Sequence, residues 1–133
     1  MDNKKEIDRL CKEFFDLFTN AGGRQPQLER VYDLVLPATI IIKKDKDTEE
    51  IYTLAAFIEP RKKILTDGTL TGFSEWETAE HTSIDNNIAQ RRSEYKKEGV
   101  LNGMFFKQEG IKLFQFIKTA KGWQITAVMW EDK

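Results

Sequence analysis

The hydrophobic pattern of the chain changes its period once, near Thr69, and this change restricts the fold more than any other feature. Before it, apolar residues recur every three or four positions, which is the spacing of one face of an α-helix. After it, aromatic and β-branched residues alternate with charged ones, as in strands whose two faces meet different surroundings. Helices followed by long strands indicate an α+β domain whose helices cover one face of an antiparallel sheet.

The first half of the chain predicts two helices before the first strand. The first helix covers about residues 4–20, with Asn3 and Glu6 as a capping box and a glycine pair as its stop. The second helix begins near Pro26 and ends at Pro37, because the residue before a proline is pushed out of the helical region. Its predicted inward side chains are Leu28, Val31, Tyr32 and Val35.

A short strand and a third helix complete this half. The strand covers residues 38–43 and is followed by a polar turn at 43–47. Thr53 is a suitable N-cap for the third helix, in which Pro60 is expected to cause a kink or an irregular start. One face of this helix carries Leu54, Phe57, Ile58, Ile64 and Leu65.

The second half predicts four antiparallel strands in a meander. The strands cover residues 73–84, 87–97, 111–118 and 123–131, with a tight turn at Asp85-Asn86, a loop at 98–103 and a turn at 119–122. Strict alternation puts Trp123 and Trp130 on opposite faces of the last strand. We predict that Trp130 points to the helices and Trp123 to the outer side of the sheet.

The composition is that of one globular domain spanning residues 1–133, and its charge balance excludes some partners. Twenty-one Lys and Arg residues stand against 22 Asp and Glu residues, so the net charge is −1. General nucleic-acid binders carry a basic excess, so nucleic acid is not an expected partner. The lone Cys11 cannot form an internal disulfide or a zinc site, and no stretch approaches the roughly 18 apolar residues of a membrane span. We therefore expect no metal, no cofactor, no membrane partner and a reducing, cytoplasmic setting.

Several short motifs resemble parts of one superfamily. Phe57-Ile58-x-Pro60-Arg61 resembles the kinked third helix of its small bacterial members. Three motifs resemble the first hairpin of those members: Phe73-Ser74-Glu75-Trp76-Glu77, Asn87-Ile88-Ala89 and Ser93-x-Tyr95. Four further motifs resemble their closing hairpin: Gly110-x-Lys112, Gln115-Phe116, Gly122-Trp123-x-Ile125 and Trp130-Glu131-Asp132. In this order, over about residues 5–132, the chain resembles the nuclear transport factor 2-like superfamily, the SnoaL-like or cystatin-type cone.

The resemblance implies a fold and an assembly more than an activity. The implied fold has three N-terminal helices packed on a strongly curved antiparallel sheet, which together form a cone-shaped α+β barrel. Such domains usually form homodimers through the outer face of the sheet, with a pocket between its inner face and the helices. The same cone hosts dehydratases, isomerases, epoxide hydrolases, polyketide cyclases and binding modules, so the fold alone does not select a function.

His81 is the only histidine and the first candidate for a catalytic general base. Strict alternation places it on one face with Glu77 and Ala79, without showing whether that face points inward. A surface or structurally hydrogen-bonded histidine is the alternative. No complete catalytic set of this fold is visible: a second histidine is missing, and Asp67 and Asp85 both fall in turns.

Arg61 lies on the apolar face of the third helix, although its guanidinium stays charged and requires an anionic partner when buried. Glu75, Glu77 or Glu59 would supply that partner in a structural ion pair between helix and sheet. The alternative is an arginine at the pocket floor that recognises a ligand carboxylate through two parallel hydrogen bonds. Arg91, with Ser93 and Tyr95 on its face of the strand, is a second candidate for a polar anchor, unless that face is solvated.

Together these features favour a small-molecule-binding domain that forms a homodimer. The ligand is expected to be small and partly apolar, with a carboxylate as one option. The candidate ligand-binding residues are Tyr32, Phe57, Arg61, Trp76, Arg91, Tyr95 and Trp130. Two alternatives stay open: an acid–base enzyme of the isomerase, dehydratase or cyclase type that uses His81 or a pocket glutamate, and a protein-interaction module.

Overall fold

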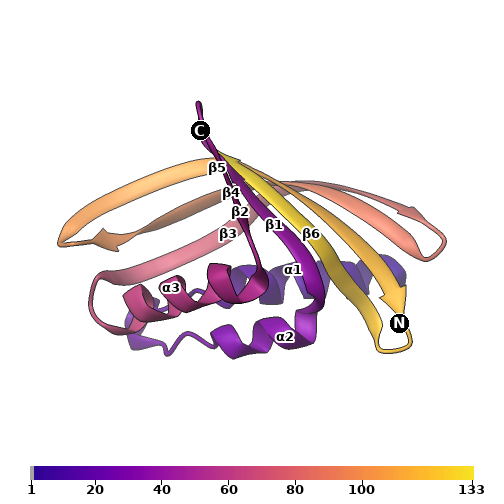
Figure 1. Cartoon of the computed structure of the whole chain (residues 1–133), viewed down its shortest axis with the longest axis horizontal. Helices are drawn as coiled ribbons and strands as arrows, with labels where there is room; N and C mark the ends of the chain where they lie inside the picture. The colour runs from indigo at the N-terminus through magenta and orange to yellow at the C-terminus, as the bar shows by residue number, and fades with distance from the viewer. Residues whose placement is uncertain (1) are drawn as a thin grey trace.

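A strongly curved sheet wraps over the helices in the computed structural model, which describes residues 2–133 (Figure 1). The helices are α1 (Asn3–Asp16), α2 (Val31–Leu34) and α3 (Leu54–Thr66), with 3-10 turns at Ala21–Gly23 and Leu28–Arg30. The strands are β1 (Val35–Lys44), β2 (Glu49–Tyr52), β3 (Leu70–Asp85), β4 (Ile88–Leu101), β5 (Met104–Thr119) and β6 (Gly122–Asp132). The predicted α+β class, with helices on one face of a curved sheet, is confirmed.

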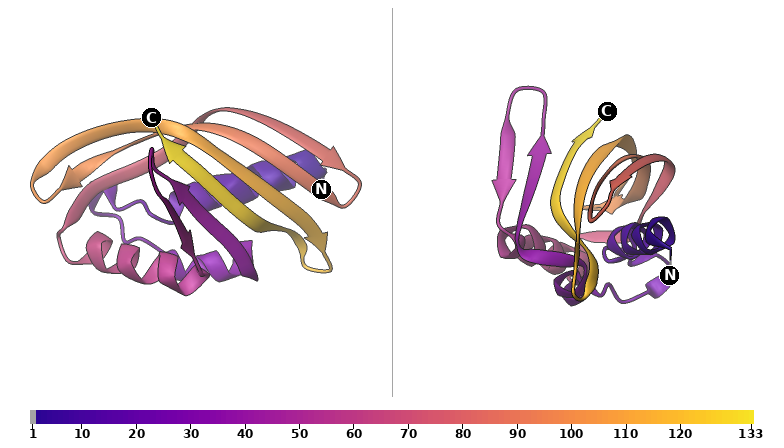
Figure 2. Two further views of the ribbon diagram at one scale, coloured as in Figure 1. Left: turned by 45° about the horizontal axis from the view of Figure 1, so that its top comes forward. Right: turned by 90° about the vertical axis from the view of Figure 1, so that its right-hand side faces the viewer.

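The sheet has the strand order β2-β1-β6-β5-β4-β3 and stays open, with β2 and β3 as its edges. Neighbouring strands are antiparallel except β1, which runs parallel to β6. The sheet is therefore mixed, whereas the sequence predicted antiparallel pairing throughout. The long connection through α3 and the meander is what permits this parallel pair, since parallel neighbours need a long crossover. The β1–β2 hairpin extends away from the helical layer (Figure 2).

The N-cap of helix α1 is Asp2, one residue before the predicted N-cap Asn3. The Asp2 carboxylate accepts hydrogen bonds from the backbone N–H groups of Lys4 and Lys5, so Asp2 is the N-cap. Asn3 and Glu6 instead hold β6, because their side chains accept hydrogen bonds from the indole N–H and the backbone N–H of Trp123. The proposed capping box is wrong, and its two residues make tertiary contacts.

The second helical segment is shorter than predicted, and Pro37 does not end it. The chain is already extended at Val35, and Pro37 lies inside β1, where the pairing with β6 shifts its register between Val35 and Ile40. Proline has no N–H to donate to a ladder, so it is tolerated at such an irregularity. The buried Thr39 hydroxyl donates to the carbonyl groups of Leu36 and Ile125 there. The following strand, β2, was not predicted.

Two tight turns make β3, β4 and β5 longer than predicted. Asn86 adopts a left-handed φ of 55°, which confirms the turn after Asp85. The predicted loop at 98–103 is wrong, because β4 continues to Leu101 and β5 starts at Met104. Asn102 and Gly103 form the connection with φ values of 51° and 82°. Asn-Gly is a strong hairpin signal, so this turn was visible in the sequence.

Two β-bulges change which residues face the helices. The register between β3 and β4 shifts at Thr78, and that between β5 and β6 shifts at Thr126. Each extra residue reverses the alternation beyond it. As a result, Trp123 and Trp130 both lie on the inner face, and Trp123 is only 3% exposed. The prediction that Trp123 points to the outer side is wrong.

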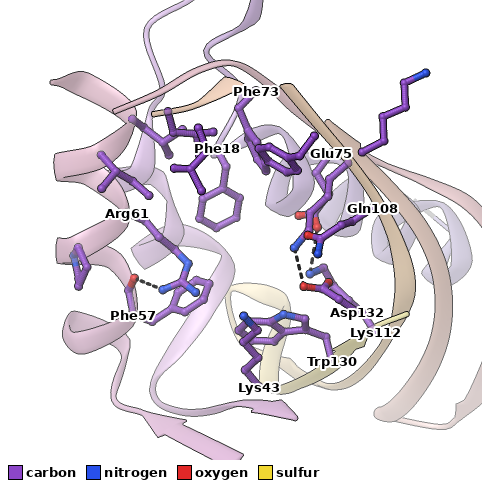
Figure 3. Close-up of a pocket in the computed structure, with 18 of the residues that line it drawn as sticks. Phe18, Lys43, Phe57, Arg61, Phe73, Glu75, Gln108, Lys112, Trp130 and Asp132 are labelled. Carbon is purple, nitrogen blue, oxygen red and sulfur yellow. Dashed lines mark hydrogen bonds and ion pairs between the residues drawn. The ribbon is translucent and has the colours of Figure 1, made fainter. Parts of the chain in front are cut away.

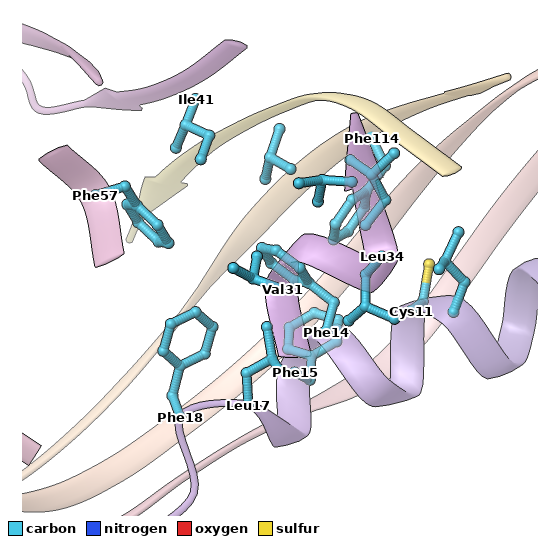
Figure 4. Packing of buried hydrophobic residues seen from close by; sticks show 14 of the residues in the cluster. Cys11, Phe14, Phe15, Leu17, Phe18, Val31, Leu34, Ile41, Phe57 and Phe114 are labelled. Atoms are coloured by element: carbon cyan, nitrogen blue, oxygen red, sulfur yellow. The ribbon is translucent and has the colours of Figure 1, made fainter. Parts of the chain in front are cut away.

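The core lies between the inner face of the sheet and the helices, and α1 supplies much of it (Figure 4). The Phe14 ring makes edge-to-face contacts with Phe18 and Phe114, and Phe18 makes one with Phe57 on α3. Asn20 ties the end of α1 to the rest, because its side-chain amide donates to the carbonyls of Leu65 and Leu70. These contacts fix α3 at a set position relative to the sheet.

Candidate functional site

A cavity of about 910 Å³ lies between α3, the end of α1 and the inner face of β3–β6 (Figure 3). Its aromatic lining consists of Phe14, Phe18, Phe57, Phe73, Phe105, Phe106 and Trp130. Pockets for small organic ligands have volumes of roughly 300–1,000 Å³ and are mainly apolar with a few polar groups. The size and the lining of this cavity both fit that description.

Cationic side chains outnumber carboxylates in the lining. The cations are Lys43, Arg61, Lys97, Lys107 and Lys112, and the carboxylates are Glu75 and Asp132. The chain as a whole has a net charge of −1, so the excess is a property of this cavity. A concave, mainly apolar surface with surplus positive charge attracts anions.

Arg61 lies on the α3 wall of the cavity, stacked on aromatic rings. Its guanidinium carbon is 3.9 Å from the Phe57 ring centroid and 5.3 Å from that of Tyr52. One Nη donates a hydrogen bond of 3.0 Å to the Phe57 carbonyl. Burial lowers the pKa of Arg61 from its ordinary value, although the guanidinium remains charged at neutral pH.

The predicted structural ion pair of Arg61 is wrong. Among residues 2–133, no carboxylate oxygen lies within 4.0 Å of its guanidinium nitrogens. Glu77 pairs with Arg91, and Glu75 pairs with Lys112. The remaining donors of Arg61 are therefore not used by a carboxylate of this part of the chain.

Lys112 and Glu75 form a buried ion pair on the opposite wall. The Lys112 Nζ lies 3.3 Å from a Glu75 carboxylate oxygen, and the two residues are 5% and 7% exposed. The ammonium also lies 4.4 Å from the Tyr95 ring centroid and 4.8 Å from that of Trp130. Burial lowers the pKa of Lys112, and the neighbouring Glu75 only partly opposes this effect.

Asp132 continues the polar network behind this pair. Its carboxylate accepts a hydrogen bond from the Tyr95 hydroxyl and forms an ion pair with Lys97, whose Nζ lies 3.0 Å from a carboxylate oxygen. Burial alone would raise the pKa of Asp132, but the Tyr95 hydroxyl and the Lys97 ammonium lower it below its ordinary value. Burial and the same hydrogen bond raise the pKa of Tyr95.

Gly110 makes room for this arrangement. It pairs with Tyr95 on β4 and with Asp132 on β6. A Cβ atom at position 110 would collide with the Tyr95 hydroxyl and the Glu131 carbonyl. Because the glycine has no side chain, the Tyr95 ring crosses β5 and reaches Asp132.

Arg91 belongs to a different network and does not line the cavity. Its guanidinium makes two hydrogen bonds to Glu77, of 3.1 and 2.5 Å, and an ion pair of 2.5 Å with Asp8 on α1. Burial would lower the pKa of Arg91, but Glu77 and Asp8 raise it above the ordinary value. The Asp8 contact fastens α1 to the sheet through Arg91, which is not part of the lining of this cavity.

Three further candidates also lie away from the cavity. Tyr32 is 54% exposed, because α2 is a single turn that buries only Val31 and Leu34. Trp76 is 39% exposed and points to the outer side, since it alternates with the inward Glu75. His81 is exposed opposite Arg92 on the outer face, because the bulge at Thr78 separates it from the face of Glu77.

The structure thus brings Phe57, Arg61 and Trp130 together, with Tyr95 directly beneath Lys112. Sequence reasoning missed Lys112 and Asp132 as site residues. Lys112 shares its strand parity with the apolar residues Phe114 and Phe116, and this signal could have marked it as inward. Asp132 shares its strand parity with Val128 and Trp130, so alternation could have marked it as inward too, although its partner Tyr95 is distant in sequence.

Neither a metal site nor a membrane helix is found in the described chain. No group of three or more His, Cys, Asp or Glu side chains within residues 2–133 is arranged to hold a metal ion. None of the helices in this range is both long and apolar enough to cross a bilayer. Cys11 is buried, and burial raises the pKa of its thiol to about 12, which suppresses the reactive thiolate.

Solved structures place this architecture among known folds. A nuclear transport factor 2-like superfamily protein from Salmonella enterica superposes with a TM-score of 0.76 at 17% identity, over 96% of this chain and 88% of that one. An NTF2-like protein from Cytophaga hutchinsonii gives a TM-score of 0.76 at 11% identity over the whole of both chains. An NTF2-like protein with a cystatin-like fold from Novosphingobium aromaticivorans gives 0.69 at 15% identity, over 97% of this chain and 80% of that one.

These neighbours confirm the predicted fold: the chain has the nuclear transport factor 2-like, cystatin-type architecture. At identities this low the likeness concerns the fold alone, which hosts many functions. No protein-family model matches the sequence, and no curated protein matches it.

Proposed function

We propose that the protein binds a small, partly apolar carboxylate in the cavity between α3 and the sheet. The observation that carries this proposal is that the Arg61 guanidinium has no carboxylate partner among residues 2–133. Its guanidinium is stacked on Phe57 at the cavity wall, and no carboxylate of residues 2–133 lies within ion-pair distance. Arg61 is half-buried, and a partly desolvated guanidinium without a carboxylate partner stabilises an anion that reaches this position.

The remaining lining supports the same class of ligand. Aromatic side chains, among them Phe18 and Trp130, offer flat apolar contacts to a hydrocarbon or aromatic body. Arginine presents N–H donors in a planar fork that matches a carboxylate, and the aromatic stacking restricts the rotation of that fork. A ligand with one anionic end and one apolar body would use both features.

Paired probes of the same shape test the role of the charge. Titration calorimetry should detect binding of 4-methylbenzoate and much weaker binding of 4-methylbenzyl alcohol. The Arg61→Met variant should lose on the order of tenfold or more in affinity for the acid, because a hydrogen bond to a charged group contributes about 1.5–3 kcal/mol. Its affinity for the alcohol should change little.

Arg24→Met is the matched control, since Arg24 is an exposed arginine outside the cavity. It should bind the acid as the unmodified protein does. If a broad set of carboxylates gives no heat and no rise in the melting temperature, the proposal fails. Equal affinity for acid and alcohol would show that Arg61 does not recognise the anion.

We also propose that the protein is a homodimer formed through the outer face of the sheet. One row of directly paired residues crosses this face from edge to edge: Ile51, Ile42, Met129, Leu113, Arg92 and His81. Met129 and Leu113 at its centre are 44% and 43% exposed, and Ile40 nearby is also exposed. An apolar patch at the middle of a sheet can meet its own copy across a two-fold axis, which covers both patches at once.

A further inference from the structure

Lys112 differs from the other lysines of the cavity in its surroundings. It is buried, whereas Lys43 and Lys97 are half-buried and Lys107 is exposed. The rings of Phe15, Tyr95 and Trp130 surround its ammonium at 5.7, 4.4 and 4.8 Å from their centroids. Its one carboxylate neighbour within 4.0 Å, among residues 2–133, is Glu75 at 3.3 Å.

This ion pair is an expensive way to fill a core position. A buried pair loses more hydration than an apolar pair of the same size, and it often gives no more stability. The pair also lines the cavity, so a bound molecule can reach it. Apolar surroundings favour the neutral amine, which is the nucleophilic form of lysine, and they lower the pKa of Lys112.

We propose that Lys112 forms an imine with the carbonyl group of an oxo acid whose carboxylate is bound by Arg61. This inference rests on the proposed function and narrows the ligand class from carboxylates to carboxylates that carry an aldehyde or ketone. Arg61 and Lys112 lie on facing walls, with Trp130 between them at the floor (Figure 3). A ligand with its two polar groups at opposite ends of a flat body matches this arrangement.

Glu75 can carry every proton that the reaction moves. The Lys112 ammonium first gives a proton to the Glu75 carboxylate, and the neutral Nζ attacks the carbonyl carbon. A C–N bond forms, and the carbonyl oxygen takes the proton from Glu75 as the C–O double bond opens. The nitrogen returns a proton to Glu75, which delivers it to the hydroxyl group. Water then leaves, a C=N⁺ double bond forms, and Glu75 is again a carboxylate, with the charge unchanged overall.

Reductive trapping tests the amine directly. The protein is incubated at neutral pH with 4-carboxybenzaldehyde and sodium cyanoborohydride, which reduces an imine to a stable secondary amine. Intact mass and peptide mapping then locate the adduct. Lys112 should be modified at least about tenfold faster than the exposed Lys96, because the cavity holds the anchored aldehyde beside its amine and the apolar surroundings favour the neutral form. Benzaldehyde, which lacks the anchor for Arg61, should react more slowly at Lys112.

Three variants separate chemistry from folding. Lys112→Arg keeps a cation beside Glu75, so the fold is retained, but the guanidinium forms no imine under these conditions and the fast adduct should disappear. Glu75→Gln should slow trapping at Lys112, because the amide cannot shuttle the proton. Lys96→Met is the matched control and should leave the adduct at Lys112 unchanged.

The outcomes distinguish this inference from the proposed function. Binding of 4-methylbenzoate together with no preferential adduct at Lys112 would overturn the imine and leave anion binding intact. An adduct spread evenly over exposed lysines would overturn it as well. If neither 4-methylbenzoate binds nor 4-carboxybenzaldehyde reacts at Lys112, both the inference and the proposed function fail.

Discussion

At the scale of single residues, the cavity depends on charges that the fold buries at some cost. Lys112 and Glu75 are buried in the wall of the cavity, and each is the counter-ion of the other. Removal of one partner from such a pair leaves an uncompensated buried charge, whereas removal of both leaves an apolar contact. The same pair therefore has very different effects on stability when it is broken and when it is replaced.

This difference is measurable by a double-mutant cycle. Lys112→Met should lower the free energy of unfolding by roughly 3–5 kcal/mol. Lys112→Met combined with Glu75→Leu should recover most of that loss, to within about 1 kcal/mol of the unmodified protein. Urea unfolding followed by tryptophan fluorescence gives all four values. Additive losses in the double variant would contradict the view that the two charges depend on each other.

Asp132 makes the stability of the folded protein depend on pH. Its pKa in the folded protein lies below the ordinary value of 3.8, so the unfolded chain binds more protons in the interval between the two values. Its contribution to stability is therefore present above pH 3.8 and is lost as the pH falls through the folded pKa. Asp132→Asn should reduce stability at neutral pH, and its difference from the unmodified protein should shrink in acid.

Thermal unfolding measured from neutral pH down into the acid range checks this sign. Asp47→Asn, in an exposed turn, is the control and should follow the unmodified protein throughout. A difference between Asp132→Asn and the unmodified protein that grows on acidification would show that the carboxylate is not held in its charged form by Tyr95 and Lys97.

At the scale of helices and strands, the sequence predicted the class of each long element and failed at local irregularities. The three-four spacing around Phe14 and the cap at Thr53 both mark real helices, because these signals act within one turn. The bulges at Thr78 and Thr126 have no such local signature. The extra residue in each strand reverses the alternation beyond it, so His81 does not share a face with Glu77, and Trp123 lies on the inner face.

The contacts of the cavity were less predictable than its walls. The alternation of β5 could have marked Lys112 as inward, since it needs only neighbouring residues. The pairing of Glu75 with Lys112, and not with Arg61, depends on the register of strands that are distant in sequence. Alternation within one strand cannot give that register, so the wrong partner was predicted for Arg61.

The β3–β4 hairpin offers a prediction at the scale of an element. Asn86 occupies its turn with a left-handed φ of 55°, which asparagine tolerates and alanine does not. Asn86→Ala should lower the free energy of unfolding by about 1–2 kcal/mol, which is the cost of that conformation for an ordinary L-residue. Asn86→Gly, the matched control, should cost little, because glycine adopts this φ freely. Chemical unfolding gives the free energy of unfolding of both variants. Equal losses of free energy in Asn86→Ala and Asn86→Gly would contradict the explanation.

At the scale of the whole molecule, the two faces of the sheet are used differently. The inner face carries the core and the cavity, and the helices cover it on one side (Figure 1). The outer face keeps apolar side chains exposed at its centre, which is unusual unless another molecule covers them. A second copy of the chain would bury this centre without blocking the cavity, because the two lie on opposite sides of the sheet.

The proposed dimer predicts how a single charge changes the assembly. Leu113→Arg introduces a guanidinium at the centre of the row, and a two-fold axis there would bring two of them close together. Like charges in an interface cost several kcal/mol, so the dissociation constant should rise by at least about tenfold.

Sedimentation equilibrium should show a dimer for the unmodified protein at micromolar concentration and monomers for the variant. Met104→Arg, at the exposed first residue of β5, should remain dimeric. A monomeric unmodified protein, or a Leu113→Arg dimer of undiminished affinity, would exclude this face as the interface.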